Sequence, residues 1–431
     1  MNPVRRRRSS PNAVSQENFL SPSSGIAEAR ARSLHQGFRA TLALPPRDVD
    51  EHHRASTTLE LVVDLAFVVA VSQAASSLHH GLGGGDVRKS IVGFVTVFFA
   101  IWWAWMSYTW FGSAFDNDDV LYRIALFVQI AGVVVLAAGV SSAFAGNFAF
   151  VTIGYVIMRI AAVFQWWRVS LFVGARPTAR RYAIGIFGLQ VGWIGILAIS
   201  PPINSVCFGL LVLGEFSVPI FAEREQSTAW HPGRIVERFG LLTIIVIGES
   251  ITSAMISIKA GIDTREHVRT YVAISLGALL TVGAMWWLYF GIDQEAMVGS
   301  ARRSSSTERN RVFGWAYGHF VVFAALAAVG ASISVATESV APLSEEHHAL
   351  MHPGIAYTVP VAVYLVTLFF LHRKSGADKG WKTYLVPMVA VIMLPLGLLD
   401  QAVLVGGLVL SAMIAVLMWP DPRSTRFEST T

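Results

Sequence analysis

The feature that most constrains this chain is a series of twelve long apolar segments, separated by Gly, Pro and charged residues. Each segment is close to the 20 or so residues that an α-helix needs to cross the hydrocarbon core of a bilayer. Backbone N–H and C=O groups must be paired in lipid, so spanning segments of this kind are helical. The sequence predicts an all-α, polytopic membrane helix bundle of about twelve transmembrane helices. The segments lie near 58–79, 89–112, 120–141, 147–170, 181–199, 203–222, 239–259, 268–292, 311–335, 354–372, 381–399 and 402–419.

Composition supports a membrane protein and leaves little room for a soluble catalytic domain. Charged residues make up 14% of the 431 residues, against about 25% in soluble proteins. No long hydrophilic loop, nucleophile elbow or P-loop is present, so we expect no enzyme. The single cysteine, Cys207, excludes an intrachain disulfide and a CxxC site. The His pairs at 52–53, 79–80 and 347–348 are interpreted as exposed loop residues, and we expect no metal site and no cofactor.

The distribution of Lys and Arg predicts the orientation. With a cytoplasmic N-terminus, 27 of the 33 basic residues fall on the cytoplasmic side and 5 on the opposite side. Arg159 lies inside a span and is counted on neither side. Basic residues collect in cytoplasmic loops, so both termini are predicted to be cytoplasmic in a multi-pass protein of the cell membrane. The basic character therefore reflects topology, and no nucleic-acid partner is expected.

Residues 1–55 are rich in Arg, Ser, Pro and Gly and are predicted to form a disordered cytoplasmic tail. No apolar segment follows the run Arg5–Arg8, so it is not a signal peptide. The run is interpreted as a cytoplasmic retention signal, or alternatively as a contact for anionic lipid headgroups. A second tail is expected at 421–431.

The two halves of the membrane region are similar to each other. Residues 56–222 and 239–420 are predicted to form two six-helix repeats, joined by a cytoplasmic linker at 223–238. Glu60 aligns with Glu237, and Ser72 with Glu249. The motif that starts at Trp105 recurs at Trp286, each Trp followed by Tyr three residues later. Because each half contains an even number of spans, the repeats are predicted to be parallel.

Three motifs resemble the low temperature requirement protein A (LtrA) family. They are TTLELVVDLAFVVAVSQ at 57–73, WWAWMSYTWFGSAFDNDD at 102–119 and HPGRIVERFGLLTIIVIGES at 231–250. The resemblance covers roughly residues 50–420 and implies a multi-pass membrane protein; the family is named for a cold-growth phenotype. The third motif departs from the family pattern at Arg234, where a His commonly stands, so no proton-handling role is carried over to that position.

Ionisable residues inside spans cost about 2.5–3.5 kcal/mol each on insertion scales and mark functional sites by default. Glu60 and Asp64 are one helical turn apart and share a helix face. Asp64 lies about 10 Å from the start of its span at Thr57. It is predicted either to be held by a neighbouring Arg or hydroxyl, or to bind a cation or a proton.

Arg159 is predicted to pair with a buried carboxylate, because an unpaired guanidinium in this position is too costly. Glu215 and Glu249 are the deepest partners, with Asp64 third. The pair is either a fixed packing element or a switch that substrate or a proton opens. His319 is interpreted as a hydrogen-bonded histidine of the bundle, or as a group that titrates near neutral pH.

Two further polar or aromatic stretches have structural interpretations. The run at 116–119 contains three Asp residues, which either bind a divalent ion weakly or cap the following helix. The Trp-rich stretch 102–110 is predicted to form an interfacial belt and a packing surface.

Three classes of function fit these features. A secondary transporter coupled to a cation or proton explains twelve spans, duplicated halves and buried carboxylates. Its site is expected between the halves, with Asp64, Glu249 and Glu60. The alternatives are a non-catalytic sensor or cold- and stress-adaptation protein, and a membrane enzyme acting on lipid. The sequence does not name a substrate.

Overall fold

The computed structural model describes residues 42–46, 57–84, 86–200, 203–225, 228, 230–291, 306–340, 351–373 and 381–419. The chain divides into two units, Met1–Ala43 and Leu44–Thr431, and every helix from Thr58 onward belongs to the second unit. The predicted tail at 1–55 lies outside the described residues except for 42–46. The tail at 421–431, the run Arg5–Arg8 and the His pairs at 52–53 and 347–348 also lie outside them.

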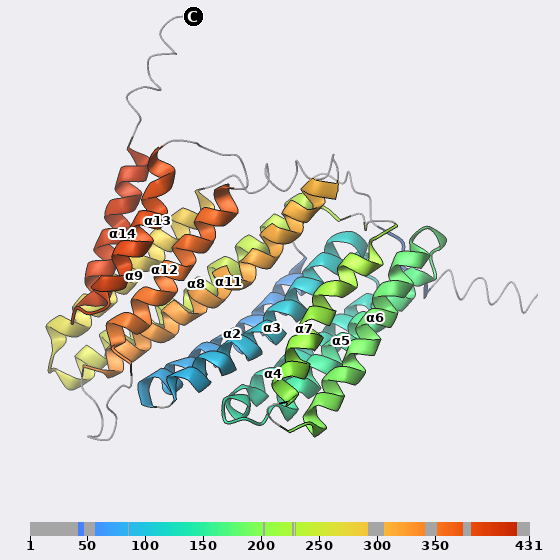
Figure 1. Cartoon of the computed structure of the whole chain (residues 1–431), viewed down its shortest axis with the longest axis horizontal. Coiled ribbons are helices and arrows are strands. Elements are labelled where there is room, and N and C mark those ends of the chain that lie inside the picture. The colour runs from blue at the N-terminus through green and yellow to red at the C-terminus, as the bar shows by residue number, and fades with distance from the viewer. Residues whose placement is uncertain are drawn as a thin grey trace, which may run out of the picture. The chain divides into compact units, whose positions relative to one another are not determined.

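Within the described residues, the regular structure is entirely helical (Figure 1). In the part of the chain that the structure describes, ten helices are long and apolar enough to cross a membrane, and α13 and α14 are shorter apolar helices. This composition indicates a multi-pass membrane protein in a lipid bilayer. The helices of the first half are α2 (Thr58–Gly84), α3 (Val87–Phe115), α4 (Val120–Phe144), α5 (Ala149–Ser170), α6 (Arg176–Gly195) and α7 (Ile203–Ala222). Those of the second half are α8 (Pro232–Thr264), α9 (Val268–Phe290), α11 (Ser306–Glu338), α12 (Pro353–Arg373), α13 (Leu385–Leu396) and α14 (Ala402–Met418).

The helices begin where side chains can satisfy the first backbone N–H groups. Asp86 accepts from the N–H of Lys89 at the start of α3, and Asp119 accepts from that of Tyr122 at the start of α4. The capping interpretation of the acidic run is therefore confirmed for Asp119. Helix α8 begins at Pro232, so part of the predicted linker 223–238 is helical instead; Pro fits the first turn of a helix because its missing N–H is not needed there.

Glycines allow several helix pairs to pack backbone against backbone. A Cβ on Gly154 of α5 would lie 2.4 Å from the Leu136 nitrogen of α4. A Cβ on Gly277 of α9 would lie 2.4 Å from the Val403 carbonyl oxygen of α14. Small residues of this kind are typical of helix contacts in membranes, where close approach supplies the packing energy.

Helix α2 connects the two halves of the chain. It packs against α3 and α4 of its own half and against α8 and α11 of the other, and these helices lie side by side in Figure 1. Helix α3 also contacts α8 and α11. Two ion pairs, Glu60 with Arg234 and Asp64 with Arg238, lie at the contact between α2 and α8.

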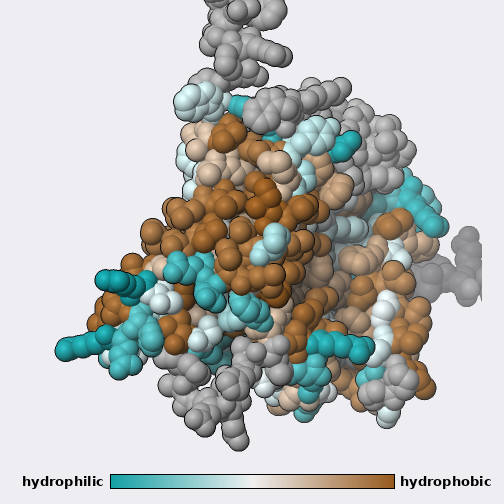
Figure 2. All heavy atoms as spheres, turned by 60° about the vertical axis from the view of Figure 1, so that its left-hand side comes forward, coloured by the Kyte–Doolittle hydropathy of each residue, from teal (hydrophilic) through white to brown (hydrophobic). Residues whose placement is uncertain are grey.

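Apolar side chains cover much of the outside. Figure 2 shows broad hydrophobic surface on the face that includes α9, α13 and α14, with hydrophilic side chains gathered toward its lower edge. Large apolar residues are exposed on both halves, for example Leu213 on α7 and Val391 on α13. Such surface fits contact with lipid tails, since a soluble monomer rarely exposes apolar patches of this extent.

Candidate functional site

Two buried ion pairs join α2 to α8. Glu60 and Asp64 are four residues apart on α2, and Arg234 and Arg238 are four apart on α8, so each pair shares a helix face. Arg234 Nη2 donates to Glu60 Oε1 at 2.7 Å, and Arg238 Nη2 donates to Asp64 Oδ1 at 2.6 Å. All four side chains are buried. We call these four residues the carboxylate–arginine cluster; its hydrogen bonds are charge-assisted and lie in a low-dielectric setting.

Glu60 uses one carboxylate oxygen to cap the start of α2 and the other to bind α8. Its Oε2 accepts from the Thr57 N–H at 2.8 Å, while Thr57 Oγ1 accepts from the Glu60 N–H at 3.2 Å. This reciprocal pair is a capping box. Glu60 Oε1 accepts a hydrogen bond from Arg234 and lies 3.5 Å from Arg238 Nη1. Glu60 therefore anchors the first turn of α2 to α8.

Asp64 differs, because only one of its oxygens is engaged. Oδ1 accepts from Trp105 Nε1 at 2.8 Å and from Arg238 Nη2 at 2.6 Å. Oδ2 is buried and has no hydrogen-bond partner among the described residues. A buried acceptor without a donor costs about 1–3 kcal/mol. Oδ2 is thus the position within the cluster at which a proton or a small cation can gain most.

Helix α3 supplies the polar surroundings of the cluster. Arg238 lies over the ring of Tyr108, with Cζ 5.0 Å from the ring centroid, and its Nη1 donates to the Tyr108 hydroxyl at 3.5 Å. Asp116, which follows α3, adds a third carboxylate 3.6 Å from Arg234 Nη2.

A further buried ion pair lies within the first half. Arg159 Nη2 on α5 donates to Glu215 Oε2 on α7 at 2.7 Å, which confirms the predicted pairing. The Glu215 carboxylate accepts four further bonds. The donors are Trp103 Nε1 (2.9 Å), Tyr155 OH (2.8 Å), Trp193 Nε1 (3.1 Å) and Gln190 Nε2 (3.4 Å). A carboxylate with this many donors is held in place, which favours the fixed packing pair over the switch.

The space beside this pair is small. A cavity of about 40 Å³ is lined by Arg159, Glu215, Trp103 and Tyr182 among others. Pockets for organic ligands measure about 300–1,000 Å³, whereas a cavity of this size holds only water molecules or an ion. A cavity of about 350 Å³ lies elsewhere, between α9, α11, α12 and the turn before α14, and contains none of the predicted site residues.

The two remaining predicted residues lie apart from both clusters. Glu249 is half-buried on α8 and packs against Gly330 of α11, where a Cβ would lie 3.2 Å from its Cγ. Within the described part of the chain, no ion pair or hydrogen bond to its carboxylate is found. His319 is buried, with Nδ1 2.8 Å from the Trp315 carbonyl oxygen and Nε2 3.1 Å from the Tyr289 hydroxyl. Because a carbonyl only accepts, Nδ1 is assigned the proton, and both ring nitrogens are then satisfied.

Outside the spans, Asp119 forms a bidentate pair with Arg168, at 3.2 Å to Nη1 and 2.5 Å to Nη2. Burial raises the pKa of this carboxyl, but hydrogen bonds from Arg168, the Tyr122 N–H and Asn117 outweigh that effect. Its pKa therefore lies below the ordinary value of 3.8. The pair ties the α3–α4 connection to the end of α5.

Several residues of the site were missed or misplaced by sequence reasoning. Arg234 and Arg238 were assigned to a linker, yet they are buried on α8; their four-residue spacing, equal to that of Glu60 and Asp64, was the available signal. Trp103 and Trp105 are buried donors to carboxylates, so the packing role of the Trp-rich stretch is confirmed and the interfacial role is wrong for them.

One His pair was also misplaced. His79 and His80 lie within α2 near its end, not in a loop, because the helix continues to Gly84. Of the two, His80 is exposed and His79 is largely buried.

Comparison with known proteins places this arrangement in a family. Residues 55–418 match the family described as bacterial low temperature requirement A protein (LtrA). The chain belongs to the LtrA family. It is 25% identical over 294 residues to "Uncharacterized protein RA0937" of Rhizobium meliloti (strain 1021), an alignment that covers 64% of this chain and 69% of the relative. No solved structure matches the chain.

In this LtrA protein, the departure at Arg234 has a structural counterpart. The guanidinium at this position forms an ion pair with Glu60 in the carboxylate–arginine cluster, and it also approaches Asp116. Two arginines on one face of α8 therefore meet the two carboxylates of α2.

Proposed function

We propose that this LtrA-family protein is a secondary transporter coupled to a proton or another small cation, with Asp64 as the coupling carboxylate. The observation that carries the proposal is the state of the Asp64 side chain. The side chain is fully buried where α2 meets α8. Its Oδ1 accepts a hydrogen bond from Arg238, while its Oδ2 has no partner among the described residues. Intramembrane carboxylates of this kind commonly serve as proton relays.

A proton on Asp64 would change how α2 is held against α8. Loss of the negative charge weakens the attraction to Arg238, while Glu60 Oε1 at 3.5 Å and the Tyr108 hydroxyl at 3.5 Å remain as alternative partners. Arg238 can therefore shift toward Glu60 without becoming an isolated buried charge. Protonation is thereby linked to the contact between the two halves, which alternating access requires.

Glu249 on α8 is proposed as a second site that binds the proton or cation. It lies eleven residues beyond Arg238, about 16 Å along the helix. It is half-buried, and none of the described residues neutralises it. A carboxylate within the membrane that lacks a protein partner can be neutralised by binding a proton or a cation, and intramembrane carboxylates commonly have this role.

The architecture we propose is twelve spans in two parallel six-helix repeats, with both termini cytoplasmic. The order of neighbouring helices supports the repeat: α2–α3, α2–α4, α4–α5, α5–α6 and α6–α7 correspond to α8–α9, α8–α11, α11–α12, α12–α13 and α13–α14. The halves have diverged in detail, since Trp105 is buried whereas the aligned Trp286 is 46% exposed. Topology reporters fused at residues 50 and 425 should both read as cytoplasmic; a signal from the opposite side would refute the arrangement.

Proton flux into proteoliposomes tests the function. The purified full chain is reconstituted around a pH-sensitive dye, and a potassium gradient with valinomycin imposes the membrane potential. We expect the wild type to acidify the lumen and Asp64→Asn to abolish the flux, because Asn keeps the acceptor for Trp105 and Arg238 but cannot ionise.

Asp263→Asn is the matched control, since Asp263 is exposed and its one ion pair among the described residues is with Lys259 on the same helix. Full flux in Asp64→Asn refutes the role of Asp64. Equal dye signals in wild-type and protein-free vesicles refute proton movement through the protein under a membrane potential and favour the sensor or cold-adaptation alternative.

A further inference from the structure

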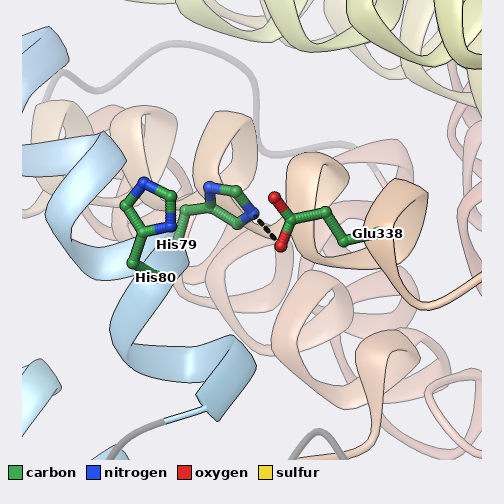
Figure 3. Close-up of side chains that lie close together, drawn as sticks. All are labelled: His79, His80 and Glu338. Carbon is green, nitrogen blue, oxygen red and sulfur yellow. Dashed lines mark ion pairs between the residues drawn. The ribbon is translucent and has the colours of Figure 1, made fainter. Parts of the chain in front are cut away.

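Two histidines and a glutamate from different halves of the chain meet at the far end of α2. His79 and His80 lie near the end of α2, and Glu338 is the last residue of α11 (Figure 3). Each offers one ligand atom, and these atoms all lie within 4.8 Å of one another. Figure 3 shows the His79 ring and the Glu338 carboxylate pointing toward each other, with the His80 ring beside them.

The geometry between His79 and Glu338 is that of two groups that face a common point. His79 Nε2 lies 2.9 Å from Glu338 Oε2, yet this nitrogen makes no well-directed hydrogen bond among the described residues. Ligand atoms about 2.0–2.1 Å from a tetrahedral zinc ion are about 3.3 Å from each other, with their lone pairs directed at the metal. A close approach with poor hydrogen-bond direction therefore fits two ligands of one ion.

The surrounding backbone favours a cation. Both α2 and α11 end at this cluster, and a helix C-terminus carries a partial negative charge from its unpaired carbonyl groups. His80 and Glu338 are exposed, so an ion can enter and the two side chains can adjust.

We propose that His79, His80 and Glu338 bind a divalent transition metal of the zinc type. Two imidazole nitrogens and one carboxylate oxygen suit zinc and neighbouring metals, whereas magnesium and calcium prefer oxygen ligands alone. Water completes the coordination. The site is about 22 Å along α2 from Asp64. A bound ion links α2 of the first half to α11 of the second, and the proposal stands independently of whether the protein transports protons.

Calorimetric titration of the purified, chelator-treated full chain in detergent with zinc chloride tests the site. We expect zinc binding in the wild type and at least about tenfold weaker binding in His80→Ala and in Glu338→Gln. Loss of an outer-shell partner alone costs about 10- to 100-fold in metal affinity, and these changes remove ligands. Cobalt chloride provides a second readout, because its visible absorption bands report nitrogen and oxygen ligands directly. Magnesium chloride should give no comparable binding.

His267→Asn is the matched control, because His267 is exposed at the start of α9 and Asn tolerates its positive φ of 51°. Its zinc affinity should equal that of the wild type. His80 and Glu338 are exposed, so their variants should elute as folded protein on size exclusion. Zinc affinity unchanged in both folded variants, or no zinc binding by folded wild type, overturns the proposal.

Discussion

The ion pair between Arg159 and Glu215 should show strong coupling in a double-mutant cycle. Arg159→Met leaves a buried carboxylate that still has four neutral donors, whereas Glu215→Gln turns an amide N–H₂ toward Trp103 Nε1 and Arg159 Nη2, both of them donors. Breaking a buried pair from one side costs about 3–5 kcal/mol of unfolding free energy. We expect about 3 kcal/mol for Arg159→Met and about 4 kcal/mol for Glu215→Gln.

The double variant should cost far less than these two values combined, because no charge is left unpaired. We expect a loss of about 2 kcal/mol, less than that of either single change, which corresponds to a coupling energy of about 5 kcal/mol. Reversible unfolding in mixed detergent micelles, followed by tryptophan fluorescence, measures the four free energies. Additive losses, equal within about 0.5 kcal/mol, would mean that the two side chains do not interact in the folded protein.

Three further predictions concern other parts of the chain. The pKa of Asp119 in the folded protein lies below 3.8, so ionised Asp119 stabilises the fold fully above pH 3.8, and this stabilisation is lost as the pH falls through the folded-state pKa. The difference in unfolding free energy between wild type and Asp119→Asn should therefore shrink with acidification. A difference that stays constant with pH would contradict the pairing with Arg168. Gly154→Ala should lower the free energy of unfolding by about 1–3 kcal/mol, because the added Cβ would lie 2.4 Å from the α4 backbone. Gly188→Ala should raise the free energy of unfolding by about 0.5–1 kcal/mol, because no atom lies within 4 Å of the added Cβ. Equal effects of the two substitutions on the unfolding curve would contradict the packing. Glu249→Gln should insert and fold as the wild type does but lose proton flux; full flux would reduce Glu249 to a packing residue.

The spans could be predicted from the sequence because the bilayer imposes a length and a polarity on each of them. The expected segment at 203–222 coincides with α7, and that at 268–292 nearly coincides with α9. The start of α8 was placed too late because Arg234 and Arg238 resemble the basic residues of a cytoplasmic loop. Charge counting cannot distinguish a solvated arginine from one that meets a carboxylate 174 residues away.

The candidate site was predicted only in part for the same reason. A guanidinium in the middle of a span requires a partner, so the pairing of Arg159 with Glu215 followed from energetics alone. The donors around Asp64 come from α3 and α8, and their identity depends on helix packing that no local pattern encodes. His79 and His80 were taken for loop residues because Gly83 and Gly84 follow closely, although the helix extends to Gly84.

The central claim is that Asp64 is the carboxylate of the cluster that takes up a proton. Infrared difference spectroscopy of the reconstituted protein measures this directly, because a protonated carboxyl group has a carbonyl stretch distinct from that of a carboxylate. Lowering the pH should produce a buried protonated-carboxyl band in the wild type and in Glu215→Gln. The band should be missing in Asp64→Asn. A band of equal intensity in Asp64→Asn, or one lost only in Glu215→Gln, would contradict the claim.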